Sequence, residues 1–173
     1  MEKLQASKTD RTMDQLVASP IEWAYLSGII DGEGCVYAVE SKSGRSIKRP
    51  SISPNFRIHL TVTNTSEHLI GWITGRFKGY VCVTHKVGQH KATRTCWRVE
   101  WRGEKAEIVL RGCLPYLTVK KYQAELAFKL REMVGSYSLK GKSISGRHAK
   151  IPDEVISERR AVVEAMKAAK KTQ

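Results

Sequence analysis

Residues 19–34 read SPIEWAYLSGIIDGEG, and they decide how the fold begins. Ser19 can cap a helix, proline is favoured in a first helical turn, and Glu22 stands three residues after the serine. This spacing predicts a helix that begins at Pro20 and ends near the closing glycines of the segment.

Small residues recur every four positions along this predicted helix, at Ala24, Gly28 and Gly32. Residues four apart lie on the same side of a helix. The backbone of another helix could therefore approach this side unusually closely.

Beyond Gly34 the hydrophobic pattern changes from helical to alternating, which is typical of strands. One predicted hairpin has an apolar face made of Val36, Ala38, Phe56, Ile58, Leu60 and Val62. Its other, mostly polar face carries Tyr37, Val39, Ser41, Asn55, Arg57, His59 and Thr61. In a second predicted hairpin, apolar residues alternate with mostly polar ones: Val81, Val83, Trp97, Val99 and Trp101 with Cys82, Thr84, Cys96, Arg98 and Glu100.

A helix is predicted between the two hairpins, capped by Thr65 or Ser66 and closed by Gly79. A short helix over 104–114 follows the second hairpin, and Pro115 marks a break before a longer helix. A linker rich in glycine, serine and lysine begins after this helix, at Gly135. The chain then ends in a helix predicted from residue 152 to about 170, with acids early and lysines late.

These elements predict an α+β fold with the order αββαββα. Four antiparallel strands form one sheet, with helices on its apolar face and the polar, basic face left open. The chain then divides into an N-terminal extension (1–19), a core (20–135), and a basic linker with a C-terminal helix (136–173).

Composition limits the class of protein and of partner. A chain of 173 residues has room for one compact domain with tails. Lys and Arg number 30 against 17 Asp and Glu, a net charge of +13, so a polyanion is the expected partner. An N-terminus of alternating charges, the lack of a membrane-length apolar run and four scattered cysteines (Cys35, Cys82, Cys96, Cys113) predict an intracellular protein without disulfides.

Two carboxylates, Asp31 and Glu33, close the first helix. The helix dipole disfavours an anion at this end by roughly 0.3 to 1 kcal/mol. A divalent cation held by carboxylate and backbone oxygens would offset that cost, and Mg²⁺ is the usual choice beside phosphates. The alternative is a pair of solvated carboxylates without a ligand.

The segment LSGIIDGEG, Leu26 to Gly34, resembles the nonapeptide of the LAGLIDADG homing endonucleases. Ser27 and Ile29 are conservative replacements in this motif, and Gly32 is small where the family has a small residue. Glu33 replaces the family's usual aspartate, and its carboxylate reaches one methylene further. The resemblance covers about residues 20 to 135.

The resemblance implies a Mg²⁺-dependent (or Mn²⁺-dependent), intron-encoded endonuclease that makes double-strand breaks in DNA. Glu33 and the carbonyl of Gly32 are then the metal ligands. Because the chain holds one motif, it is expected to form a homodimer through Ala24 and Gly28. Neighbouring matches around LPYLTVKKYQA and VTNT add Lys120, Asn64 and His68 as further catalytic residues.

The open sheet face would read bases, and basic loops would contact phosphates. The predicted DNA-binding residues on the sheet are Tyr37, Val39, Ser41, Asn55, Arg57, His59, Thr61, Cys82, Thr84 and Arg98. Those in loops and the linker are Arg45, Lys48, Arg49, Lys86, Arg94, Lys140, Lys142 and Arg147.

Two alternatives stay open at the level of sequence. The chain could be a non-catalytic binder on the same scaffold, either an RNA-splicing maturase or a DNA-binding regulator. Separately, a zinc site is an alternative to free thiols and exposed histidines, with the possible ligands Cys82, His85, His90 and Cys96.

Overall fold

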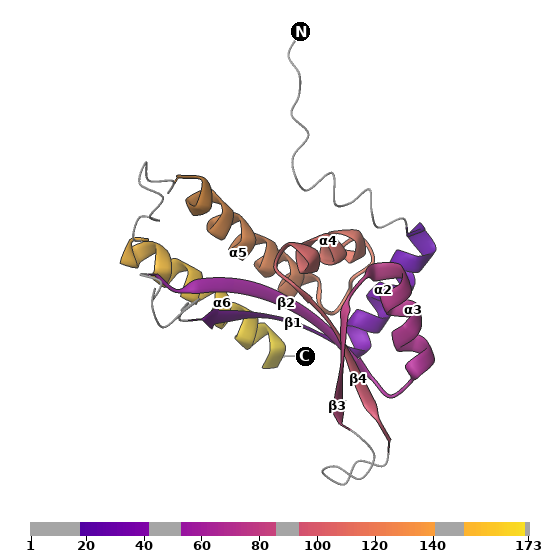
Figure 1. The fold of residues 1–173 in the computed structure, drawn as a ribbon. Helices are drawn as coiled ribbons and strands as arrows, with labels where there is room; N and C mark the ends of the chain where they lie inside the picture. The colour runs from indigo at the N-terminus through magenta and orange to yellow at the C-terminus, as the bar shows by residue number, and fades with distance from the viewer. Residues whose placement is uncertain (1–17, 42–52, 86–93, 141–150, 172–173) are drawn as a thin grey trace. The chain divides into compact units, whose positions relative to one another are not determined.

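The computed structural model describes residues 18–41, 53–85, 94–140 and 151–171 (Figure 1). In chain order the elements are α2 (Pro20–Glu33), β1 (Gly34–Ser41), β2 (Asn55–Asn64), α3 (Glu67–Phe77), β3 (Tyr80–His85), β4 (Cys96–Arg102), α4 (Glu104–Cys113), α5 (Lys121–Lys140) and α6 (Asp153–Lys171). The strands form one sheet of order β1-β2-β4-β3. The predicted α+β class and the order of helices and hairpins are confirmed.

Helix α2 begins as the sequence predicts. The Oγ of Ser19 accepts a hydrogen bond from the backbone N–H of Glu22, and the Glu22 carboxylate accepts one from the N–H of Ser19 at 2.8 Å. At the other end Gly34 has φ −83°, so it is not a left-handed cap. Glycine is needed there because a Cβ would lie 2.5 Å from the carbonyl oxygen of Ile30.

Helix α3 differs from its prediction at the C-terminal end. Ser66 is the N-cap, with its Oγ accepting from the N–H of Leu69. Lys78, not Gly79, takes the left-handed position after the helix, with φ 53°. A Cβ on Gly79 would lie 2.2 Å from Val99 Cγ1, so the glycine is there for space and not for a turn.

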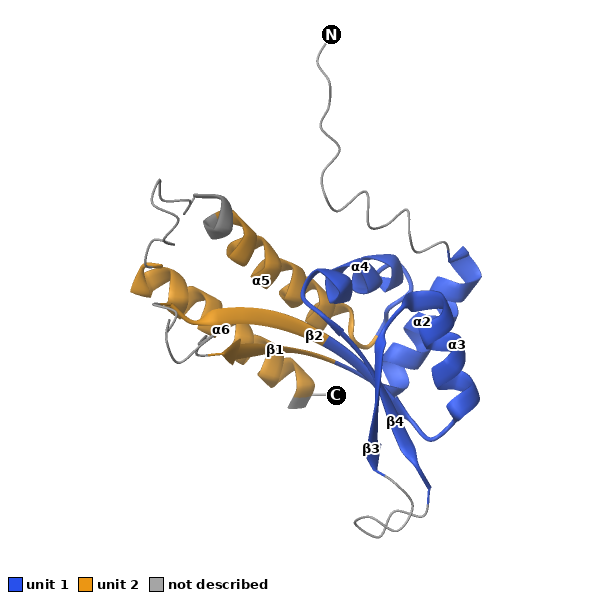
Figure 2. Cartoon of the chain, in the orientation of Figure 1, with its two compact units in different colours: residues 1–35, 60–118 blue, residues 36–59, 119–173 orange. Residues whose placement is uncertain are grey.

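The chain splits into two compact units, residues 1–35 with 60–118 and residues 36–59 with 119–173 (Figure 2). The core of the first unit joins helices α2, α3 and α4 to strands β2 and β4. Its largest buried side chain is Trp101, whose indole N–H donates to the carbonyl of Phe77 at 2.8 Å. The ring of Phe77 in turn contacts Trp23 of α2, with centroids 4.9 Å apart.

Helix α2 is held against α4 by a buried polar contact and by close packing. The Ser27 hydroxyl, fully buried, donates to the carbonyl oxygens of Trp23 and Cys113, at 2.7 and 3.1 Å. A Cβ on Gly112 of α4 would lie 2.6 Å from the ring of Trp23. One side of α2 is therefore fixed on α4 by Ser27 and Trp23.

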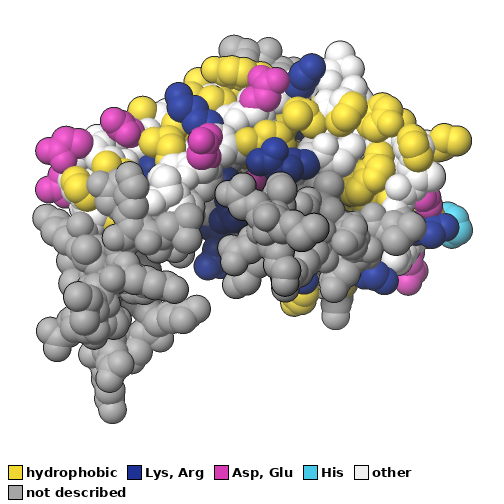
Figure 3. All heavy atoms as spheres, turned by 90° about the horizontal axis from the view of Figure 1, so that it is seen from above, with side chains coloured by type: hydrophobic (Ala, Val, Ile, Leu, Met, Phe, Trp, Pro, Cys, Tyr) yellow, Lys and Arg dark blue, Asp and Glu magenta, His cyan; other side chains and the backbone are white. Residues whose placement is uncertain are grey.

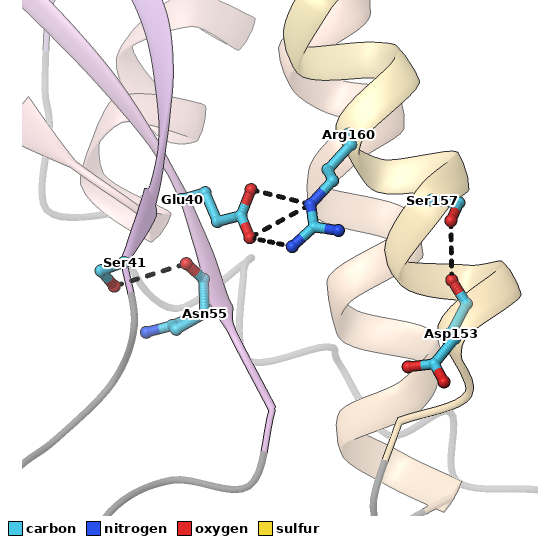
Figure 4. A network of polar contacts seen from close by, with 6 residues as sticks. All are labelled: Glu40, Ser41, Asn55, Asp153, Ser157 and Arg160. Atoms are coloured by element: carbon cyan, nitrogen blue, oxygen red, sulfur yellow. Dashed lines mark hydrogen bonds and ion pairs between the residues drawn. The ribbon is translucent and has the colours of Figure 1, made fainter.

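In the second unit, α6 is tied to strand β1 and to α5. Arg160 makes a two-pronged ion pair with the carboxylate of Glu40 at the end of β1 (Figure 4). Arg159, buried, donates to the carbonyl of Met133 at 2.7 Å and lies over the ring of Phe56. Helix α5 continues through Gly135 to Lys140, so residues 135–140, expected to open a linker, are helical.

Three strand positions have a burial that the predicted alternation did not indicate. Val81 and Val83 pair with Val99 and Trp97 and so share their apolar face, but they are 37% and 45% exposed. Thr61, predicted on the open face, is only 6% exposed. Alternation therefore assigned faces correctly on β3 without indicating how far the core extends beneath them.

Gly79→Ala tests the close approach of Gly79 to the core. Overpacking against Val99 and Trp101 is expected to lower the free energy of unfolding by about 1–3 kcal/mol. Gly71→Ala is the control: Gly71 is exposed on α3 with open space around it, so alanine should stabilise the helix by about 0.5–1 kcal/mol. Urea unfolding measures both, and equal effects of the two variants would contradict the packing argument.

Cys113 offers a test of burial between α2 and α4. Burial raises the pKa of its thiol to about 12, against about 8.5 for an unfolded cysteine. The folded chain therefore keeps a proton that the unfolded chain releases, and this contribution to stability falls as pH rises above about 8.5. At pH 8 the thiolate fraction of Cys113 is about 10⁻⁴, so a maleimide should label it only after unfolding.

The part-exposed Cys35, Cys82 and Cys96 are the internal controls for this labelling. Peptide mapping by mass spectrometry should find them modified in the native chain. Labelling of Cys113 at a rate similar to theirs would show that the α2–α4 contact opens readily.

Candidate functional site

Opposite the side held by α4, helix α2 exposes an apolar stripe. Ile21 and Tyr25 are 81% and 56% exposed, and Gly28 and Gly32, also exposed, continue the line toward the end of the helix. A Cβ on either glycine would meet nothing within 4 Å. In Figure 3, hydrophobic side chains gather where α2 and α3 lie.

The interface residues predicted from sequence lie on or beside this stripe. Gly28 belongs to it, and Ala24 lies at its edge, half-buried. Tyr25 is steadied from α3 by an edge-to-face contact with Trp72, with centroids 4.9 Å apart. Helix α2 therefore presents a smooth apolar surface with a fixed aromatic ring beside it.

The two carboxylates that close α2 have different surroundings. Asp31 Oδ2 accepts a hydrogen bond from the backbone N–H of Thr118 at 2.8 Å. Glu33, the last residue of the helix, is exposed and makes no hydrogen bond or ion pair with the part of the chain that the structure describes. Its charge is therefore available to a ligand.

The other predicted catalytic residues lie at the starts of helices. Asn64 ends β2, and its Oδ1 accepts from the N–H of Ser66 at 2.8 Å. His68 is exposed in the first turn of α3. Lys120 is half-buried just before α5, and its carbonyl accepts from the N–H of Ala124. Among the described residues of the first unit, no hydrogen bond or ion pair joins Asn64, His68 and Glu33 to one another.

In the second unit, the open face of β1 and β2 carries an aromatic pair. The rings of Tyr37 and His59 stack with centroids 5.1 Å apart and planes 25° apart. Arg57 and Val39 are exposed beside them. Toward the loop, the hydroxyl of Ser41 on β1 donates a hydrogen bond to the backbone carbonyl of Asn55 on β2 (Figure 4).

In the first unit, the polar face of β3 and β4 also carries the predicted groups. Cys82 pairs with Arg98 in the antiparallel register, and Thr84 donates to the carbonyl of Cys96 at 3.0 Å. Arg98 is exposed. Glu100 on the same face is buried and ion-paired with Arg102, so this end of the face is neutralised.

Of the predicted basic contacts outside the strands, Arg94 is exposed. The others lie outside the described residues, except that Lys140 is described in its backbone alone: Arg45, Lys48, Arg49, Lys86, Lys142 and Arg147. Their assignment to phosphate contacts stays a prediction.

The zinc alternative depends on His90, which also lies outside the described residues. Among the residues that the structure does describe, no three His, Cys, Asp or Glu side chains come together as metal ligands. The described helices include none long and apolar enough to cross a membrane.

Sequence reasoning missed three contacts that shape this site. They are the Ser27–Cys113 hydrogen bond, the packing of Gly112 on Trp23, and the hydrogen bond from Thr118 to Asp31. Each joins residues more than 80 positions apart, and periodicity carries no signal over such a separation.

No protein-family model and no curated protein matches the chain. Among solved structures, the homing endonuclease I-CvuI in complex with a DNA target aligns with a TM-score of 0.63 at 18% identity, over 86% of this chain and 82% of that chain. The archaeal intron-encoded homing endonuclease I-Vdi141I, complexed with DNA, gives 0.59 at 13% identity, over 86% and 84%. The LAGLIDADG homing endonuclease I-GzeII, in complex with its DNA target, gives 0.56 at 17% identity, over 84% of this chain but 43% of that one. The expectation drawn from LSGIIDGEG is thereby confirmed for the architecture: the chain has the fold of the LAGLIDADG homing endonucleases.

Proposed function

We propose that the chain is a site-specific DNA endonuclease of the LAGLIDADG homing type. It acts as a homodimer with Mg²⁺ or Mn²⁺ and hydrolyses both strands of a long, pseudo-palindromic DNA site. We place it in the cytoplasm of a prokaryote or in an organelle, encoded within an intron. Similarity to DNA-bound homing endonucleases of the same fold supports the class of activity.

The exposed carboxylate of Glu33 carries the proposal. A negative charge is unfavourable at a helix C-terminus. Asp31, near this end, offsets the cost by accepting a hydrogen bond from the backbone N–H of Thr118. Glu33 has no such donor among the described residues. A charge kept in this position without a protein partner is best explained by a positive ligand.

The donor chemistry at the end of α2 fits a hard divalent cation. The carbonyl of Gly32 belongs to the last helical turn, where carbonyl groups lack helical N–H partners. Together with the Glu33 carboxylate it offers oxygen ligands only, which suit Mg²⁺. When bound, such an ion supplies Lewis-acid stabilisation of the scissile phosphate and lowers the pKa of a bound water.

Other side chains would then orient the reactants. The Lys120 amine is assigned to the scissile phosphate or to the water that attacks it. The Asn64 amide and the His68 imidazole are assigned to hydrogen bonds with water or phosphate. A lysine beside a phosphate stabilises developing negative charge by a charge-assisted hydrogen bond.

The open sheet face is assigned to DNA recognition. A two-stranded ribbon fits the major groove, and Arg57 and Arg98 can pair with guanine while Asn55 can pair with adenine. The net charge of +13 supports strong contact with phosphates, whose strength falls with salt.

The need for two copies follows from the number of motifs. One chain offers a single Glu33, whereas two strands must be cut. The chain aligns with most of I-CvuI but with 43% of I-GzeII, so it corresponds in size to part of that longer enzyme. The stripe of Ile21, Tyr25, Gly28 and Gly32 is the surface on which a second α2 would pack.

Glu33→Gln tests the metal assignment. The amide keeps the shape but loses the charge, so cleavage of DNA spanning the uninterrupted host locus should fall by about 100-fold or more. Binding to the same DNA, measured without divalent metal, should stay within about threefold. Glu158→Gln on α6 is the control and should cut normally. Retained cutting by the Glu33 variant would remove the metal assignment, and wild-type binding without cutting would favour a DNA-binding regulator.

Gly28→Leu tests the dimer surface. The chain alone has open space at Gly28, and leucine suits a helix better than glycine by about 1 kcal/mol. The variant should therefore fold with equal or higher stability, yet sediment as a single chain where the wild type sediments as two. Gly75→Leu on α3 is the matched control and should remain a dimer. A Gly28→Leu dimer would show that another surface joins the copies.

A further inference from the structure

We propose that Asp31 is a positioning residue that acts through Lys120. Its carboxylate holds the chain segment leading to Lys120 against the end of the helix that carries Glu33. This inference rests on the proposed endonuclease function and adds a residue to its site.

The contact itself lies within the first unit. Asp31 Oδ2 accepts the backbone N–H of Thr118 at 2.8 Å, across 87 positions of sequence. Thr118 is the last residue of that unit, in the irregular segment between α4 and α5. The hydrogen bond therefore anchors the point at which the chain leaves the first unit.

Chain geometry relates this anchor to both proposed catalytic groups. Glu33 follows Asp31 by two residues of helix, a rise of about 3 Å. Lys120 follows Thr118 by two residues, which span at most about 7 Å between Cα atoms. The hydrogen bond therefore joins the two segments at points two residues before Glu33 in one and two residues before Lys120 in the other.

The residues just before Thr118 are held to α4. The side chain of Leu117 is buried, and the N–H groups of Tyr116 and Leu117 donate to the carbonyl of Cys113. These bonds continue the last turn of α4. The bond to Asp31 instead ties the segment to α2, the helix on which Glu33 stands.

The position of Asp31 indicates that its negative charge does not stabilise helix α2. An aspartate in the last turn of α2 opposes the helix dipole, and it also raises the pKa of the Cys113 thiol. A carboxylate is nevertheless a strong acceptor for a backbone N–H. Loss of this acceptor would free the segment before Lys120, and a shift of about 1 Å in a reacting group can slow a reaction about 100-fold.

Amide hydrogen exchange tests the contact without DNA or metal. In Asp31→Ala the Thr118 N–H should exchange at least about fivefold faster than in the wild type. In Asp31→Asn the amide oxygen can still accept this bond, so exchange should stay near the wild-type rate. Glu164→Ala, which removes an exposed carboxylate from α6, is the control. Unchanged exchange in Asp31→Ala would overturn the proposal.

Single-turnover cleavage tests the role. Asp31→Ala should cut about 10- to 100-fold more slowly than the wild type, with DNA affinity within about threefold, and Asp31→Asn should regain most of the rate. In a Lys120→Ala background, adding Asp31→Ala should not slow cleavage further, because the Lys120 amine that Asp31 positions is already absent. Melting temperatures confirm that each variant is folded.

The outcomes separate the two proposals. A full additional loss in the Lys120→Ala background shows that Asp31 does not act through Lys120, and an Asp31→Asn variant as slow as Asp31→Ala shows that Asp31 needs its charge, as a metal ligand would. Either result overturns the positioning role while leaving the endonuclease function intact. A wild-type chain that never cuts overturns the endonuclease function and the role of Lys120 with it.

Discussion

The hydroxyl of Ser27 and the indole of Trp23 set the orientation of α2, and most of the proposed site follows from that orientation. Buried hydroxyls are generally hydrogen-bonded, and Ser27 donates both to the Trp23 carbonyl within α2, at 2.7 Å, and to the Cys113 carbonyl at the end of α4, at 3.1 Å. Gly112 lets the Trp23 ring approach the α4 backbone. With one side of α2 fixed in this way, the side that bears Ile21, Tyr25 and the two exposed glycines has to face outward.

The same orientation gives the two carboxylates different surroundings at one helix end. Asp31 accepts a hydrogen bond from the backbone N–H of Thr118, whereas Glu33, two residues on, is exposed and has no partner among the described residues. Successive turns of a helix present residues in fixed directions, so two acids 200° apart around the axis cannot meet the same partner. A carboxylate that is bonded to the chain and a carboxylate that we propose as a metal ligand can therefore lie close together in one motif.

Local patterns predicted the elements and their faces well. The capping box placed the start of α2, and strand alternation assigned most of the residues of both hairpins to the correct face. It erred at the end of α3, where Lys78 and not Gly79 takes the left-handed position, and where Gly79 instead leaves space for Val99 and Trp101. It also gave no warning that Thr61 is buried or that Val81 and Val83 are not, since alternation shows direction and not depth. The link between Asp31 and Thr118 depends on how distant segments meet, which no short window of sequence contains.

Strand β3 is an edge of the sheet, and it exposes Val81 and Val83. An unpaired edge with β-branched apolar side chains is a template for self-association between molecules. The excess of positive charge on the chain opposes such contacts, because two copies that approach edge to edge repel each other. Added salt screens this repulsion, and it would therefore favour contacts between the exposed β3 edges of two molecules.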